Sequence, residues 1–230
     1  FQVRGVEADL LGVPLIPGQP YLAQSSGWAV EAVAGHHLGA GGAGPDSAGG
    51  VRVDSLDVDS DGNGQAWLTL TSRGGRTRIG SAQVQDQKLS ATWGAVFEGS
   101  GSGFDKGGVS SPVVFTHEGE QLMLHAGFKS GRSTVGLATS TDGLSWDSEG
   151  QVLGTGIEWE SVSLVPNSVQ VLDGGDYRLW YSGFDGDRWQ LGYARRAPGQ
   201  ADWTRFVDSS TDLTRPLLAA ELGLFHPDGM

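Results

Sequence analysis

Apolar and polar residues alternate with the period of a β-strand in several short runs of this chain, and glycine-rich turns separate the runs. In the clearest example, residues 165–172 and 177–183 flank the tetrapeptide 173–176, which reads Asp-Gly-Gly-Asp. Turns of this composition favour the positive φ angles of tight hairpins. Two further runs follow at residues 189–195 and 203–206. The pattern predicts four short antiparallel strands in succession.

The same order of runs occurs twice upstream with a fixed period. An apolar residue followed by glycine recurs at intervals of 56 residues, as Ile79-Gly80, Val135-Gly136 and Leu191-Gly192. A tryptophan follows each dipeptide after ten to thirteen residues. A period of this length indicates a repeat architecture. Because one four-stranded meander cannot shield its own apolar faces, such units stack in a ring. The sequence therefore predicts an all-β fold, a β-propeller of four-stranded antiparallel blades.

We expect the whole chain to form one propeller domain. Complete blades are predicted at residues 51–106, 107–160 and 161–223. Residues 1–50 would hold the end of a preceding blade and a Gly/Ala-rich loop, and residues 224–230 the start of a further blade. Because both ends read as parts of blades, we expect an incomplete propeller taken from a longer protein.

Charge and composition narrow the range of partners. The net charge is -12 with a pI near 4.6, which argues against nucleic acid because phosphate binding requires a basic surface. No apolar run is long enough to span a membrane. Cysteine is absent, so the chain has no disulfide and no thiolate metal ligand. An acidic surface is compatible with a neutral sugar or with calcium, although solubility alone also accounts for it. Arginine outnumbers lysine 12 to 3, which suggests a bacterial source.

Three motifs carry a resemblance to a known superfamily. They are residues 140–146 (Ser-Thr-Asp-Gly-Leu-Ser-Trp), 177–183 (Tyr-Arg-Leu-Trp-Tyr-Ser-Gly) and 191–194 (Leu-Gly-Tyr-Ala). They resemble the repeats of the five-bladed β-propeller glycosidases, which include arabinanases, xylosidases, invertases, levansucrases and mannoside phosphorylases. The resemblance covers about residues 50–230. It implies a five-bladed type of propeller, an extracytoplasmic location and a carbohydrate partner held in the central funnel.

The resemblance also implies acidic catalytic residues, but the chain departs from the expected pattern. In the superfamily an Asp directly precedes a Pro at the start of an inner strand, whereas this chain has Ser111-Pro112 and Val165-Pro166. Asp54 is the one acid at the matching place in the first unit. Glycosidases need two carboxyl groups in different environments. The catalytic candidates are therefore Asp54 as base or pKa modulator, Glu160 as general acid and Asp105 as a third acid. The alternative interpretation of each is a solvated loop acid.

Two neighbours of Glu160 are candidates for substrate binding. Trp159 could stack against the face of a sugar ring, and Glu158 lies beside it. Packing of Trp159 between blades is the alternative.

A possible calcium loop lies in the first unit. Asp57, Asp59 and Asp61 place oxygen ligands at alternate positions, and Gly62 occupies the sixth position. The twelfth position is Leu68 instead of the expected Glu. The same stretch coincides with a predicted hairpin turn, which favours Asp and Gly without any metal. Calcium is the one cofactor that the sequence suggests.

Three functional hypotheses follow. The leading one is a glycan-binding propeller, related to glycoside hydrolases, whose site is non-catalytic or degenerate. The second is an active glycoside hydrolase that uses paired carboxylates. The third is a calcium-dependent adhesion or scaffold propeller. Sequence alone does not decide whether the chain is an enzyme.

Overall fold

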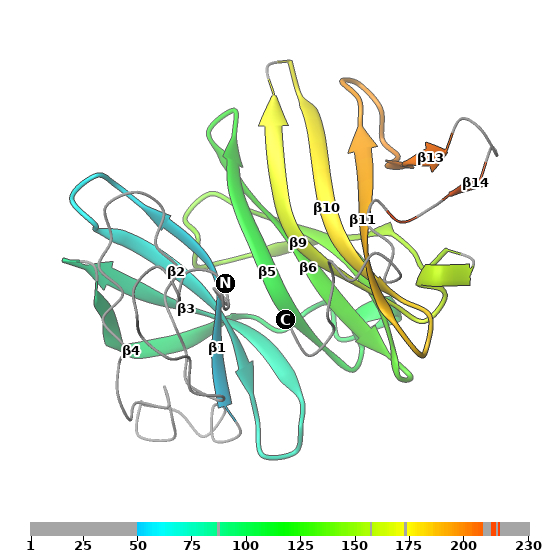
Figure 1. Ribbon diagram of the computed structural model, residues 1–230. Coiled ribbons are helices and arrows are strands. Elements are labelled where there is room, and N and C mark those ends of the chain that lie inside the picture. The colour runs from blue at the N-terminus through cyan, green and yellow to red at the C-terminus, as the bar shows by residue number, and fades with distance from the viewer. Residues whose placement is uncertain are drawn as a thin grey trace, which may run out of the picture.

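A computed structural model describes residues 50–86, 88–156, 158–172, 174–208, 213–214 and 216 (Figure 1). The blade fragments predicted at residues 1–50 and 224–230 lie outside these described residues, except for Gly50, which begins β1. The strands are β1 (Gly50–Val58), β2 (Gly64–Thr71), β3 (Thr77–Gln85), β4 (Lys88–Phe97), β5 (Gly108–His117), β6 (Glu120–Lys129), β7 (Arg132–Ser140), β8 (Asp147–Leu153), β9 (Ser163–Leu172), β10 (Asp176–Phe184), β11 (Trp189–Arg196), β12 (Thr204–Arg205), β13 (Val207–Asp208) and β14 (Leu213–Thr214).

The strands form three successive antiparallel meanders. The first blade is the sheet β1-β2-β3-β4, the second contains β5 to β8, and the third contains β9 to β12. One parallel pair, Ser133↔Ser163, joins the second and third blades into a continuous sheet. Short 3-10 turns, η2 (Gly103–Asp105) and η3 (Glu158–Glu160), lead into β5 and β9. The fold is thus the predicted all-β propeller, seen here as three blades. Neither 3-10 turn in the described part of the chain is long and apolar enough to cross a membrane.

The core lies between the blades because each strand directs alternate side chains to opposite faces of its sheet. Burial of each large apolar side chain contributes about 2 kcal/mol to stability. The cluster between the first and second blades consists of Trp67, Ile79, Phe97, Val109, Met123, Ala138 and Trp146. The cluster between the second and third blades includes Leu124, Val135, Leu153, Trp159, Leu164, Tyr177, Leu179, Tyr181, Ala194 and Trp203. Two of the three recurring tryptophans, Trp146 and Trp203, therefore pack between blades, and the side chain of the third, Trp93, lies outside the described part.

Close packing explains the repeated glycine. Gly80, Gly136 and Gly192 occupy the same place on the third strand of each blade, where a side chain of the second strand lies across the glycine. A Cβ added at Gly136 would come within 3 Å of both His125 and Phe104. A ring that covers a glycine on the neighbouring strand is a known way of stabilising a sheet. A ring covers the glycine in the second and third blades, whereas Leu70 covers Gly80 in the first, so the 56-residue period marks a position where each blade leaves no room for a side chain.

Candidate functional site

The first strand of each blade lies beside the first strand of its neighbour, so that β5 contacts both β1 and β9 (Figure 1). We call these three the inner strands, because such strands line the central channel of a propeller. Each carries a bulge, where two residues oppose one residue of the adjacent strand. The bulged pairs are Val53-Asp54, Ser111-Pro112 and Pro166-Asn167. Bulges redirect side chains and are common beside functional sites.

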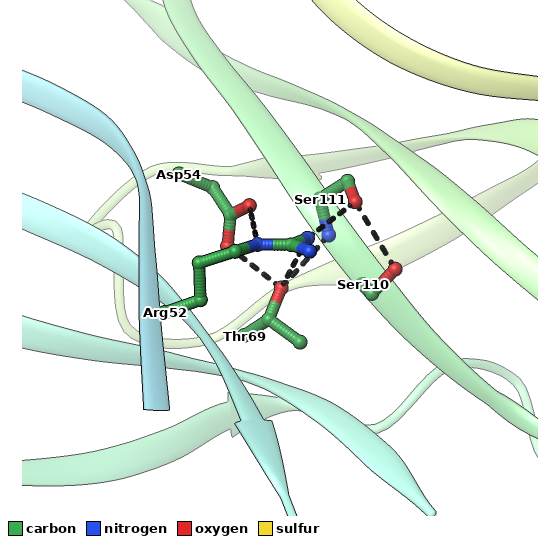
Figure 2. Close-up of polar contacts among 5 residues, drawn as sticks. All are labelled: Arg52, Asp54, Thr69, Ser110 and Ser111. Carbon is green, nitrogen blue, oxygen red and sulfur yellow. Dashed lines mark hydrogen bonds and ion pairs between the residues drawn. The ribbon is translucent and has the colours of Figure 1, made fainter. Parts of the chain in front are cut away.

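Asp54 is the centre of a polar cluster at the first of these bulges (Figure 2). Its Oδ1 accepts a hydrogen bond from Arg52 Nε at 2.7 Å, and its Oδ2 accepts one from the Thr69 hydroxyl at 2.7 Å. The Asp54 side chain is 11% exposed, whereas that of Arg52 is 55% exposed. The carboxylate is therefore fixed from two sides, and the guanidinium beside it remains accessible to a ligand.

The second blade completes the cluster (Figure 2). Arg52 Nη2 donates to the Ser111 hydroxyl at 2.8 Å, and the Ser111 amide donates to Thr69 Oγ1 at 2.9 Å. The Ser110 hydroxyl lies 3.2 Å from that of Ser111. Ser111 adopts a φ of 54°, which is costly for a non-glycine residue and is common at functional sites. These contacts hold two inner strands in a fixed relative position.

The third blade repeats the central contact with different chemistry. Asn167 stands at the bulge position that Asp54 occupies in the first blade, and its Nδ2 donates to Ser182 Oγ at 3.0 Å. Ser182 in turn occupies the place of Thr69 on the second strand. Pro112 holds this position in the second blade. Among the described inner strands, the bulge position thus carries one carboxylate, one imino acid and one amide.

Glu160 lies away from this cluster, in a buried contact within the third blade. Its Oε2 accepts a hydrogen bond from the Tyr181 hydroxyl at 2.7 Å, and its Oε1 pairs with Arg205 Nε. Burial raises the pKa of Glu160, although hydrogen bonds and charge from Tyr181 and Arg205 oppose that shift. Arg205 also donates to the carbonyl of Gly154. The carboxylate therefore ties η3 to β10 and β12.

This arrangement predicts a structural effect for Glu160. The substitution Glu160→Gln keeps the shape but leaves the Arg205 guanidinium without its carboxylate, so the free energy of unfolding should fall by about 2 kcal/mol. Urea denaturation at neutral pH measures the change. Glu158→Gln is the matched control, because Glu158 is exposed on the same turn and should leave stability unchanged. Equal stability of Glu160→Gln and the wild type would contradict the role.

Asp105 has a comparable position in the second blade. It is fully buried, and its carboxylate accepts hydrogen bonds from the Ser100 amide at 2.7 Å and the Ser100 hydroxyl at 2.5 Å. Within the described residues, the hydrogen bonds and ion pairs of Asp54, Asp105 and Glu160 go to other residues and not to one another. The three predicted acids are instead held separately, each by its own partners.

Trp159 is a packing residue in this structure. Its ring is 7% exposed and stacks on Tyr181 at 5.9 Å, in a slot opened by Gly183 and Gly192. Phe104 stacks on His125 at 5.8 Å in the matching slot of the second blade. A ring buried in this way offers no free face to a sugar, which favours the alternative interpretation of Trp159 as a residue packed between blades. Glu158 beside it is exposed on η3, with a φ of 55°.

The predicted calcium loop forms a hairpin turn between β1 and β2. Asp59 Oδ1 accepts hydrogen bonds from the amides of Asp61 and Asn63, each at 2.9 Å, and thereby organises the turn itself. Within the described residues, no group of three or more His, Cys, Asp or Glu side chains is placed to hold a metal, Asp57, Asp59 and Asp61 included. Calcium binding by this loop rests on the sequence pattern alone.

Sequence reasoning identified Asp54 but missed its partners Arg52, Thr69 and Ser111. The available signal was the repeat itself, because Thr69 and Ser182 both stand just after the second-strand residue that pairs with the repeated glycine. A small hydroxyl residue at that place indicates a hydrogen bond to the bulge of the inner strand.

No protein-family model matches this chain, and no curated protein matches it in sequence. Several solved structures are similar in fold. The β-1,2-mannobiose phosphorylase from Listeria innocua, solved with β-1,2-mannobiose, matches with a TM-score of 0.55 and 17% identity, over 73% of this chain and 44% of that protein. A glycosyl hydrolase from Bacteroides ovatus matches with a TM-score of 0.51 and 16% identity, over 73% and 51% of the two chains.

A family 117 glycoside hydrolase from Zobellia galactanivorans matches with a TM-score of 0.50 and 13% identity, over 67% of this chain and 59% of that protein. The chain therefore spans about half the length of these enzymes. At these identities the likeness concerns the fold. The chain has the β-propeller fold found in glycoside hydrolases.

Proposed function

We propose that this chain is part of an extracytoplasmic bacterial glycan-binding propeller, related to glycoside hydrolases, whose inner-strand site binds sugar without cleaving it. The observation that carries the proposal is the chemistry at the three bulges. Asp54 supplies a carboxylate there, while Pro112 and Asn167 occupy the equivalent positions. The sequences of β5 and β9 contain no acid.

The chemistry of glycoside cleavage supports a binding role. Both stereochemical routes need two carboxyl groups, about 5–5.5 Å apart for retention and roughly 6.5–9.5 Å apart for inversion. Among the described acids, Glu160 and Asp105 are committed to buried structural contacts. The cluster at Asp54 instead combines a carboxylate, the half-exposed Arg52 guanidinium and several hydroxyls. Such a set of donors and acceptors suits the hydroxyl groups of a neutral sugar.

The experiment is a glycan titration combined with an activity assay on the longest available form of the protein. β-1,2-Mannobiose is the first ligand to test, because it is the ligand of a fold neighbour, followed by plant and bacterial polysaccharides. Saturable binding without turnover of ligand or aryl glycosides is the expected result. Asp54→Asn should weaken binding about tenfold, because a charge-assisted hydrogen bond is lost and Arg52 is released from its partner.

Asp57→Asn is the matched control for that substitution. Asp57 lies on the same strand and is exposed, so its replacement should leave affinity unchanged. Turnover by the wild type that disappears in Asp54→Asn would replace the binding role with that of an active glycoside hydrolase. If wild type and Asp54→Asn bind the glycan with equal affinity, the inner-strand cluster around Asp54 is not the binding site and the proposal is contradicted.

A further inference from the structure

A second candidate site lies at the opposite end of the inner strand β5. A cavity of about 450 Å³ opens there, lined by His117, the turn Gly174-Gly175, Tyr177, Arg196 and Gln200. Its volume falls within the range of small-molecule sites. From Ser111 to His117 the strand extends about 20 Å, so the cavity is separate from the cluster around Asp54.

The cavity is basic, although the chain as a whole has a net charge of -12. Its lining contains Arg196 and His117 and, within the part of the chain that the structure describes, no aspartate or glutamate. The exposed carboxylate of Glu118, outside the lining, lies 3.8 Å from His117 Nε2, so Arg196 is the main source of the positive charge. Two nearby arginines share one carboxylate, because Asp176 pairs with Arg195 at 2.7 Å and with Arg178 at 3.8 Å. Arg196 has no carboxylate partner among the described residues, and its positive charge is left for a ligand.

Aromatic rings hold the two basic side chains in place. The Arg196 guanidinium carbon lies 4.2 Å from the centre of the Tyr177 ring and 5.9 Å from that of Trp203. The His117 ring packs against the same tyrosine at 5.2 Å, with an interplanar angle of 73°. A guanidinium stacked on a ring keeps its N–H edge free, and that edge matches the two oxygens of a carboxylate. Little side-chain freedom remains to be lost when an anion binds.

We propose that this cavity binds the carboxylate group of a small ligand, with Arg196 as the principal contact and His117 as a second donor. A sugar acid and a simple organic acid both present this group, and the cavity is large enough for either. The site is independent of the glycan-binding role proposed for the inner strands, since it uses different residues at the other end of β5.

The test is a calorimetric titration of the chain with sodium glucuronate, sodium acetate and glucose. Saturable binding of glucuronate without binding of glucose is expected, because the neutral sugar lacks the carboxylate. Tighter binding of glucuronate than of acetate identifies a sugar acid as the source, and equal affinities identify a simple carboxylate. Failure of both carboxylates to bind would overturn the proposal.

Two substitutions locate the binding. Arg196→Gln should weaken carboxylate affinity at least about tenfold, the loss expected for a charge-assisted hydrogen-bond pair. Arg132→Gln is the matched control, because it removes the same charge from an exposed residue at the start of β7. Circular dichroism confirms that each variant folds, and His117→Gln provides a second variant that leaves Arg196 stacked. Undiminished affinity in both Arg196→Gln and His117→Gln would also overturn the proposal.

Discussion

Replacing Gly192 with alanine is expected to destabilise the chain by about 3 kcal/mol, the cost of overpacking a well-filled core. A Cβ at this position would come within 3 Å of the rings of Tyr181 and Trp159. Both rings belong to the cluster between the second and third blades, and Trp159 stacks on Tyr181. Because the rings fill the slot from both sides, neither can move away without opening a void. Urea denaturation followed by tryptophan fluorescence measures the loss.

Gly94, another glycine within a strand, provides the control for Gly192→Ala. Gly94 lies in β4, and a Cβ added there would have nothing within 4 Å. Gly94→Ala should therefore leave stability unchanged or raise it slightly, because alanine restricts the unfolded chain. Equal effects of the two substitutions would show that the repeated glycine serves strand flexibility and not ring packing.

The fold was predictable because its main signals are local. Alternation of apolar residues identifies strands such as 177–183, and turns such as 173–176 separate them. The spacing of Gly80, Gly136 and Gly192 then gives the period, since in every blade a Cβ at this place would clash with a neighbouring side chain. Neither signal depends on which residues meet across blades.

The candidate site was harder to predict because it depends on pairing between strands. Asp54, Pro112 and Asn167 are equivalent only through their bulges, and a bulge is defined by the partner strand. In the sequence, the superfamily's Asp-Pro dipeptide aligns with Ser111-Pro112 and Val165-Pro166, which indicates Ser111 and Val165 as the positions that should carry the acid. In the structure the equivalent position lies one residue later in the second blade and two residues later in the third, so Asn167 is the counterpart of Asp54.

Burial of the lead-in turns also escaped prediction. The lead-in turns of the second and third blades each place an aromatic residue and a buried acid against the sheet. These pairs are Phe104-Asp105 and Trp159-Glu160, which are 55 residues apart. The aromatic ring of each turn packs on the sheet because glycines on two adjacent strands leave room for it. An acid in a loop can therefore be a buried structural residue as well as a solvated or catalytic one. The sequence does not show this, because it does not reveal where glycines leave room for the turn against the sheet.

Acidification is expected to destabilise the junction of the first and second blades through His125. This side chain is fully buried between Phe97 and Phe104, and neither ring nitrogen has a hydrogen-bond partner in the described structure. Burial lowers the pKa of His125 from 6.5 to about 4. In the unfolded chain the imidazole takes up a proton as the pH falls below 6.5, whereas in the folded chain it stays neutral down to pH 4.

The unfolded state therefore binds more protons within this window, and the free energy of unfolding decreases as the pH falls. A difference of about 2.5 pKa units corresponds to about 3 kcal/mol of stability lost by pH 4 relative to neutral pH. The substitution His125→Phe should abolish this component, because the phenyl ring carries no titratable group. Tyr181 occupies the equivalent slot in the third blade, which shows that a larger ring fits beside the repeated glycine.

Urea denaturation of wild type and His125→Phe at pH 7.5, 6, 5 and 4 measures the effect. The stability difference between the two proteins should shift in favour of His125→Phe by about 3 kcal/mol across this range. His117→Gln, which removes a histidine outside the cluster of the first two blades, controls for the loss of one titratable group. A stability difference between wild type and His125→Phe that does not change with pH would mean that His125 takes up its proton without unfolding. The junction would then have to admit water beside the imidazole, because a charged ring in contact with two phenyl groups needs a polar partner.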